Sequence, residues 1–389
     1  MEPESQAANQ DQPSAEAGQS LDMMHGLTNP SADAPKANRL RRLFMASDGL
    51  RVGWAVPIFI ALTILFVILL SVAVGMMTGH KSHGRPTSLS PFAALASEAV
   101  LALAAAGAAA IMARLEHRNI LDYNLRGSRG FAHFVGGLTA GFAALSALVG
   151  ALAWGGWLHF GGSGLVGAHI VGFGALWAVV FLCTGIFEEG SFRCYLQFTF
   201  TRGINFWWAL AIIAALCLDL ALRAKGNGVW GVYVMALLGV VPCLALHLKG
   251  TPGSSFWQAA WVTSTLFGFV HTSNHGENWI GIFAAGAIGF VFCVSVWLTG
   301  SAWWAIGCHA AWDWSETFFY GAADSGLVAK GHFLTTNPAG NAFWSGGTDG
   351  PEGSALILGA LVLLMLILLV VYGRSRTAAA AEGSAAQAP

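Results

Sequence analysis

Two adjacent carboxylates and an arginine stand in the middle of an apolar stretch, in the segment EEGSFR at residues 188–193. Ionisable residues are expensive to bury in lipid, so their presence there indicates a functional site. Glu189 and Arg193 lie four residues apart, a spacing that favours an ion pair on a helix. Glu188 projects about 100° away from Glu189 and needs another partner. We therefore expect the arginine to hold Glu189 and Glu188 to be available for chemistry.

Two later segments add imidazoles and a third carboxylate. The segment FGFVH at residues 267–271 ends in His271, and the segment HAAWD at residues 309–313 places His309 and Asp313 one helical turn apart. A carboxylate can act as a general base on water, and a neutral imidazole can orient the same water. Hydrolysis is the simplest chemistry that these residues support.

The residues leave two versions of this chemistry open. In a metal-dependent version, Glu188, His271 and His309 are candidate zinc ligands, with a fourth position open for water. In a metal-free version, the same side chains activate the water directly. Zinc is therefore a possible cofactor.

The composition indicates a membrane protein. Of its 389 residues 55% are hydrophobic and 10% are charged, whereas soluble domains carry about 25% charged residues. The net charge is -1 and the basic residues gather beside apolar runs, so we expect no nucleic-acid partner. The six cysteines form no CxxC pair and are interpreted as packing residues, not as a disulfide framework.

The apolar runs predict an all-α fold, a polytopic transmembrane helical bundle with about 8–10 spanning helices, because a span needs about 20 apolar residues. The candidate runs are at about 53–77, 90–113, 131–156, 168–200, 206–222, 229–248, 255–273, 278–299, 301–320 and 354–373. Gly137 and Gly141 offer small surfaces for close helix packing, which we interpret as ordinary bundle packing. Glu98 is a lone acid near the start of the second run.

The remaining segments complete the expected organisation. We expect a disordered cytoplasmic tail over 1–38, N-terminal transmembrane helices over 39–168, a catalytic membrane core over 169–320 and an outer loop over 321–353. The glycine-rich stretch at 340–353 is interpreted as a flexible connection. A last transmembrane helix over 354–373 and a disordered tail over 374–389 follow.

The distribution of basic residues predicts the orientation. Arginines cluster before the first run, after the second run and after the last run, while 321–353 holds a single lysine. Basic loops tend to face the cytoplasm, so we expect both termini to be cytoplasmic. The N-terminus lacks the pattern of a cleaved leader, and no eukaryotic targeting motif is present, which favours a bacterial inner membrane.

In this order and on successive apolar runs, EEGSFR, FGFVH and HAAWD resemble the EExxxR, FxxxH and HxxxN motifs of the CPBP (CAAX protease and bacteriocin-processing) family, which includes type II CAAX prenyl endopeptidases. The resemblance covers about residues 170–320 and implies an intramembrane endopeptidase, either a metalloprotease or a glutamate protease. It implies that Glu188 and His271 activate the attacking water.

The resemblance also implies roles for the other motif residues. His309 and the residue at position 313 would stabilise the oxyanion or hold the site, and Glu189, Arg193 and Phe267 would support it. The usual asparagine of the third motif is Asp313 here. An ionised aspartate accepts hydrogen bonds but donates none, so we expect Asp313 to orient His309 or to bind a metal.

A second departure concerns the spacing of the motifs. The runs between the first and second motifs are interpreted as an inserted helical hairpin at 206–248. With the expected span boundaries, Glu188 lies about 20 residues along its span and His271 about 17 along an oppositely directed one. That order predicts opposite faces of the membrane, unless the fourth helix is long and tilted or the hairpin does not fully cross.

Our first hypothesis is an endopeptidase that hydrolyses membrane-associated peptides, with lipidated ones among the candidates. Its partners would be membrane lipid and a membrane-associated peptide or protein substrate. One alternative is an ion- or proton-coupled transporter that uses the buried acids and histidines. The other is a non-catalytic immunity or scaffold protein with the same fold, in which Glu188, His271 and His309 need not converge.

Overall fold

The computed structural model describes residues 43–46, 48–78, 88–223, 240–250, 253–274, 276–324 and 326–385, with side chains described as far as residue 373. The chain divides into two units, Met1–Ala46 and Ser47–Pro389. Of the first unit the structure describes four residues, which end in β1 (Met45–Ala46). The expected tail at 1–38 lies outside the described residues.

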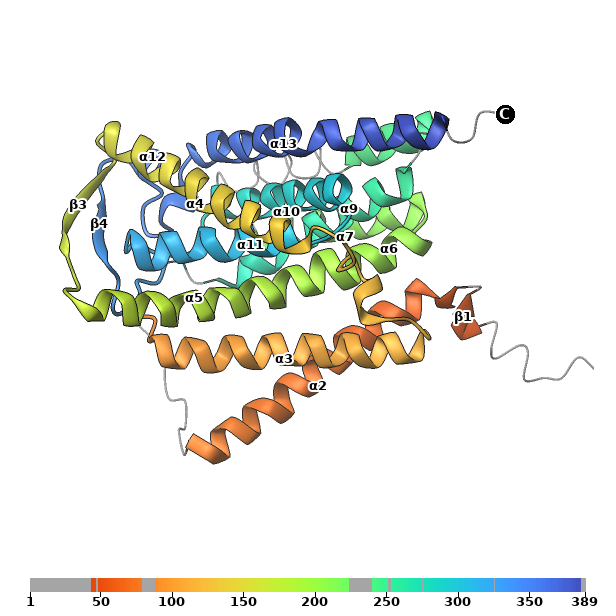
Figure 1. Ribbon diagram of the computed structural model, residues 1–389, viewed down its shortest axis with the longest axis horizontal. Helices are drawn as coiled ribbons and strands as arrows, with labels where there is room; N and C mark the ends of the chain where they lie inside the picture. The colour runs from red at the N-terminus through yellow and green to blue at the C-terminus, as the bar shows by residue number, and fades with distance from the viewer. Residues whose placement is uncertain are drawn as a thin grey trace, which may run out of the picture. The chain divides into compact units, whose positions relative to one another are not determined.

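The second unit is a bundle of apolar helices (Figure 1). Its helices are α2 (Val52–Thr78), α3 (Pro91–Leu115), α4 (Gly130–Trp154), α5 (Ala168–Glu189), α6 (Gln197–Gly203), α7 (Phe206–Arg223), α9 (Ser254–Val270), α10 (Trp279–Thr299), α11 (Trp303–Asp313), α12 (Ala342–Ser345) and α13 (Ile357–Ala385). Its strands are β2 (Gly49–Leu50), β3 (Leu158–Ser163) and β4 (Leu334–Pro338).

Six helical segments of the described chain are long and apolar enough to cross a membrane. They are Val52–Met77, Pro91–Leu115, Gly130–Trp154, Ala168–Gly203, Phe206–Arg223 and Trp279–Thr299. Val240–Lys249 and Ile357–Gly373 are shorter apolar helices. The expected all-α, polytopic membrane bundle is confirmed.

Two expected segments differ in extent from the helices found. Of the hairpin expected at 206–248, α7 and the helix Val240–Lys249 are described, and residues 224–239 lie outside the described part of the chain. At the other end, α13 continues to Ala385, past the expected boundary at 373. The alanine-rich sequence TAAAAEGSA has high helix propensity, which explains the extension.

The fourth span is one long helical segment of 36 residues, Ala168–Gly203. It consists of α5, a π-helical stretch Gly190–Leu196 and α6. A second π-helical stretch, Trp314–Phe319, extends α11. Both stretches begin directly after motif residues, and π-helical turns occur often at functional sites.

This length corrects the expectation that Glu188 and His271 lie near opposite faces. The Gln197 amide of α6 donates to the Phe256 carbonyl near the start of α9 at 3.1 Å, so the end of the long segment adjoins the start of α9. Counted from that shared end, Glu188 precedes Gly203 by 15 residues and His271 follows Ser254 by 17. At about 1.5 Å per residue, the two side chains reach nearly the same depth.

Glycines bring the backbones of neighbouring helices together in two groups. A Cβ on Gly137 or Gly141 of α4 would overlap the backbone of α11, and one on Gly185 of α5 would lie 3.0 Å from the Ile306 carbonyl oxygen of α11. In the second group, a Cβ on Gly268 of α9 would lie 2.9 Å from the Ile282 carbonyl oxygen of α10. The packing expected for the Gly137 and Gly141 pair is thus found within the bundle.

The segment from 321 to 353 is packed against the bundle. Strand β4 pairs antiparallel with β3, with Leu158 opposite Pro338 and Phe160 opposite Thr336. Beyond β4, Ser345, Asp349 and Pro351 are buried. Of the stretch interpreted as a flexible connection, residues 340–344 are exposed, whereas buried residues from Ser345 to Gly353 pack against the helix ends.

Gly141→Ala is expected to destabilise the protein by about 1–3 kcal/mol, because the added methyl group would force α4 and α11 apart. Alanine has the higher helix propensity, so the loss would come from packing. Gly150→Ala on the same helix is the matched control, since no atom lies within 4 Å of its added Cβ. Thermal unfolding of the purified proteins, followed by tryptophan fluorescence, measures both; equal midpoints would contradict the close contact.

Candidate active site

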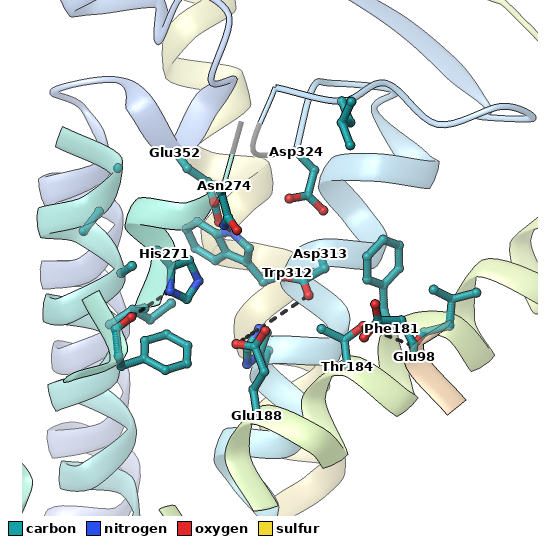
Figure 2. A pocket seen from close by; sticks show the side chains of 18 of the residues that line it. Glu98, Phe181, Thr184, Glu188, His271, Asn274, Trp312, Asp313, Asp324 and Glu352 are labelled. Carbon is teal, nitrogen blue, oxygen red and sulfur yellow. Dashed lines mark hydrogen bonds and ion pairs between the residues drawn. The ribbon is translucent and has the colours of Figure 1, made fainter. Parts of the chain in front are cut away.

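Three helical segments bring the motif residues together. The long fourth segment supplies Glu188 and Glu189, α11 supplies His309 and Asp313, and His271 caps the end of α9. Glu188, His271, His309 and Asp313 line one cavity of about 310 Å³, to which α3 adds Glu98. Figure 2 shows Glu98, Glu188, His271 and Asp313 around a common space, with Glu188 below it and His271 at one side.

His309 is the centre of the polar contacts. Its Nδ1 lies 2.8 Å from Glu189 Oε1, and its Nε2 lies 3.8 Å from Glu188 Oε2 and 3.5 Å from Asp313 Oδ2. Glu189 therefore accepts from Nδ1 and fixes the ring, while Nε2 faces the cavity. The expectation that Asp313 lies beside His309 is confirmed, but the direct bond from Glu189 to His309 was not foreseen.

Arg193 holds Glu189 in place, as the four-residue spacing predicted. Arg193 Nε lies 3.1 Å from Glu189 Oε2, and both side chains are fully buried. The guanidinium also lies over the Phe267 ring, 4.2 Å from its centroid. A Cβ on Gly289 would come within 2.5 Å of Arg193 Nη2, so the absence of a side chain there makes room for the cation.

His271 is oriented by its own helix. Its Nδ1 lies 2.8 Å from the Phe267 carbonyl oxygen, the acceptor one turn earlier. A ring nitrogen facing a carbonyl carries the proton, so Nε2 is the acceptor that remains for the cavity. Phe267 therefore contributes its carbonyl to His271 and its ring to Arg193, which links the second motif to the first.

The proposed zinc ligands do not form a ligand set here. Among the residues that the structure describes, no three His, Cys, Asp or Glu side chains are grouped so that they could hold a metal ion. His309 uses Nδ1 for Glu189 and faces two carboxylates with Nε2. Zinc binding therefore stays a prediction, and we derive no step through a metal.

Polar residues that the motifs did not indicate also line the cavity. Thr184 donates to Glu98 at 3.3 Å, and Asn274 lies one turn beyond His271. Asp324 and Glu352 enter the cavity from the segment 321–353, on the side opposite Glu188 in Figure 2. Burial raises the pKa of Asp324 and that of Glu352 above the ordinary range.

Comparison with known proteins found a match to one family model. The sequence model of the family described as Rce1-like, type II CAAX prenyl endopeptidase Rce1-like, matches residues 243–315. This range contains the FGFVH and HAAWD motifs and begins after EEGSFR. Searches among curated proteins and among solved structures found no match. The resemblance to this family is confirmed for the matched segment, and contacts in the structure tie the first motif to it.

Arg193→Met is expected to lower the unfolding free energy by about 3–5 kcal/mol, because it leaves the buried Glu189 carboxylate without its cation. Thermal unfolding in detergent measures the loss. Arg223→Met is the control, since its pair with Asp219 is exposed and contributes little. The double variant Arg193→Met, Glu189→Gln should recover part of the loss; no recovery would argue against an uncompensated charge as the cause.

Asp349→Asn is expected to stabilise the protein increasingly as the pH rises. Burial raises the pKa of Asp349 to about 6, aided by Asp324 and opposed by the Asn278 N–H. The folded state therefore favours the protonated acid, and ionisation weakens folding as the pH rises from about 4 to about 7. Unfolding midpoints of wild type and variant across this range test the sign; a difference that shrinks with rising pH would contradict it.

Proposed function

We propose that this chain, whose residues 243–315 resemble type II CAAX prenyl endopeptidases, is an intramembrane endopeptidase that cleaves membrane-associated peptides with an activated water. The observation that carries the proposal is the shared cavity of Glu188, His271 and His309, which come from three separate segments of the chain. A non-catalytic scaffold places no requirement on this convergence.

In the proposed reaction, Glu188 is the general base. Its Oε2 is buried and has no hydrogen-bond partner in the structure, so the carboxylate is free to bind a water. His271 Nε2 accepts the second proton of that water as a hydrogen bond and directs the oxygen lone pair toward the scissile carbonyl carbon. As the oxygen attacks, one water proton passes to Glu188.

His309 stabilises the charge that develops on the carbonyl oxygen. With Nδ1 bound to Glu189, a protonated ring would donate from Nε2 to the oxyanion, and three carboxylates within 4 Å would balance its charge. Glu188 then returns its proton to the amine nitrogen as the C–N bond breaks. The second water proton stays on the new carboxylic acid until it passes to the amine, so the products are a carboxylate and an ammonium and the proton balance closes.

The surroundings of the site suit a peptide held within the bilayer. Phe181, Ala284 and Ile288 line the same cavity as the acids, and apolar helices surround it. The substrate class we propose is a membrane-embedded or lipid-linked peptide whose scissile bond enters this cavity. Apolar walls would hold its side chains while the polar residues act on the bond.

We further propose an inner-membrane location in a bacterium with both chain ends in the cytoplasm. The loop between α3 and α4 carries Arg118, Arg126 and Arg129, and α6 ends beside Arg202. The segment 321–353, with one lysine, lies at the other end of the helices. This asymmetry supports the orientation.

Glu188→Gln is expected to lower kcat by about 10²–10⁴-fold on any peptide that the wild type cleaves, because an amide accepts no proton from water. The assay uses purified protein in lipid nanodiscs and a library of membrane peptides, with mass spectrometry of the products. The thermal midpoint should remain close to that of the wild type, since Glu188 Oε2 makes no hydrogen bond and its contact with His309 Nε2 is long, at 3.8 Å. Cleavage by Glu188→Gln at the wild-type rate would remove Glu188 from the mechanism.

Glu189→Gln is the neighbouring comparison. We expect it to lower the thermal midpoint as well as the rate, because it breaks the contact with Arg193 and loosens His309. The same cleavage assay, run with and without a chelator, tests whether the reaction proceeds without a metal. Activity that disappears with chelator and returns with Zn²⁺ would show that a metal carries the chemistry.

A further inference from the structure

The cavity has an acidic wall opposite Glu188. We define the acidic roof as Glu316, Asp324, Asp349 and Glu352, of which Asp324 and Glu352 line the cavity directly. The Glu352 carboxylate accepts from Trp312 Nε1 at 2.5 Å, and Asp324 accepts from Thr317 at 3.0 Å. These bonds fix two carboxylates at the cavity wall without neutralising either one.

Buried oxygens of the roof lack partners. Glu316 is 1% exposed, yet its Oε1 has no hydrogen-bond partner. Asp349 is equally buried, and its Oδ1 also has no hydrogen-bond partner. A Cβ on Gly350 would lie 3.4 Å from Glu316 Oε1, which places this carboxylate against the stretch that carries Asp349 and Glu352. A buried, unpaired acid beside other acids either keeps its proton, as the raised pKa of Asp324 and of Glu352 indicates, or binds a cation from outside the chain.

No lysine or arginine among the described residues that line the cavity supplies that cation. Arg193 contacts Glu189 and Phe267 and does not line the cavity. Arg118, Arg126 and Arg202 pair with acids near the opposite end of the bundle. Of the described residues that line the cavity, five are acids, two are histidines and none is lysine or arginine.

The ligand that fits is an organic cation. No three described acids are grouped to hold a metal ion, whereas an ammonium or guanidinium on a flexible stem can reach carboxylates that stand apart. A cavity of about 310 Å³ has room for one long side chain beside a peptide bond. Charge-assisted hydrogen bonds to carboxylates are stronger than neutral ones, and low polarity strengthens them further.

We propose that the acidic roof is a specificity site that binds a lysine or arginine side chain of the substrate close to the scissile bond. This proposal rests on the proposed peptidase function and names its substrate class. The long side chain would extend from the cleavage point toward Asp324 and Glu352, while Glu188 acts on the bond from the other side.

The first test uses a peptide that the wild type cleaves in the library described above. It is remade with Lys, Gln or Glu at each position within four residues of the cleaved bond. At one position, kcat/KM for the Lys peptide should exceed that for the Gln peptide by about tenfold or more, and Glu should be worse than Gln. Equal rates for Lys and Gln at every position would overturn the proposal and leave the peptidase function standing.

The second test assigns the preference to the roof. In the double variant Asp324→Asn, Glu352→Gln, both amides retain an acceptor for Thr317 and Trp312, and the Lys-to-Gln ratio should fall to about one. Asp122→Asn is the matched control, because Asp122 lies in the loop between α3 and α4 and does not line the cavity. The Lys-to-Gln ratio of this variant should equal that of the wild type. A ratio that the double variant leaves unchanged would contradict a role for Asp324 and Glu352.

A binding measurement separates failure of this proposal from failure of the peptidase function. Fluorescent apolar peptides that differ in a single Lys or Gln are titrated into wild-type nanodiscs. Tighter binding of the Lys peptide without any cleavage would support the roof while rejecting the peptidase function. Equal binding of both peptides would overturn the roof proposal, whether or not cleavage occurs.

Discussion

The buried pair between Glu189 and Arg193 is the interaction on which the site depends. Neither side chain touches solvent, so each charge requires the other. Glu189 also fixes the His309 ring, and Arg193 rests on Phe267, whose carbonyl orients His271. Through one ion pair, the three motifs become a single connected structure. The mutual attraction of the two charges offsets part of the cost of burying them in an apolar bundle. The pair in turn positions both imidazoles.

The sequence predicted much of this arrangement because its signals are local. Apolar runs of sufficient length indicated the spans, and the i, i+4 spacing indicated the pair of Glu189 with Arg193 and the approach of His309 to Asp313. The bond from Glu189 to His309 joins residues 120 positions apart. No periodicity within either helix contains that information.

The errors have physical causes as well. The depth of Glu188 was misjudged because its position was counted along the fourth run as if that run were an ordinary span of about 20 residues, whereas the segment has 36 residues and includes a π-helical stretch. The segment 321–353 was interpreted as a connection because glycine-rich stretches are often exposed. Its acids, Asp324 and Glu352, are instead part of the cavity wall. Burial of a loop depends on the surface it covers, which a single sequence does not reveal.

The two groups of glycine contacts divide the chemistry between two bodies. Close backbone contacts at Gly137, Gly141 and Gly185 hold α4, α5 and α11 together. Glu188 and His309 therefore lie on one group of helices that has little freedom to slide. The close contact at Gly268 holds α9 against α10, and His271 lies on this second group of helices. A small shift of one helix group relative to the other would change the distance from Glu188 to His271 but not the distance from Glu188 to His309. The glycine contacts thus fix Glu188 relative to His309, whereas the position of His271 relative to Glu188 depends on contacts between the two groups, such as that of Arg193 with Phe267.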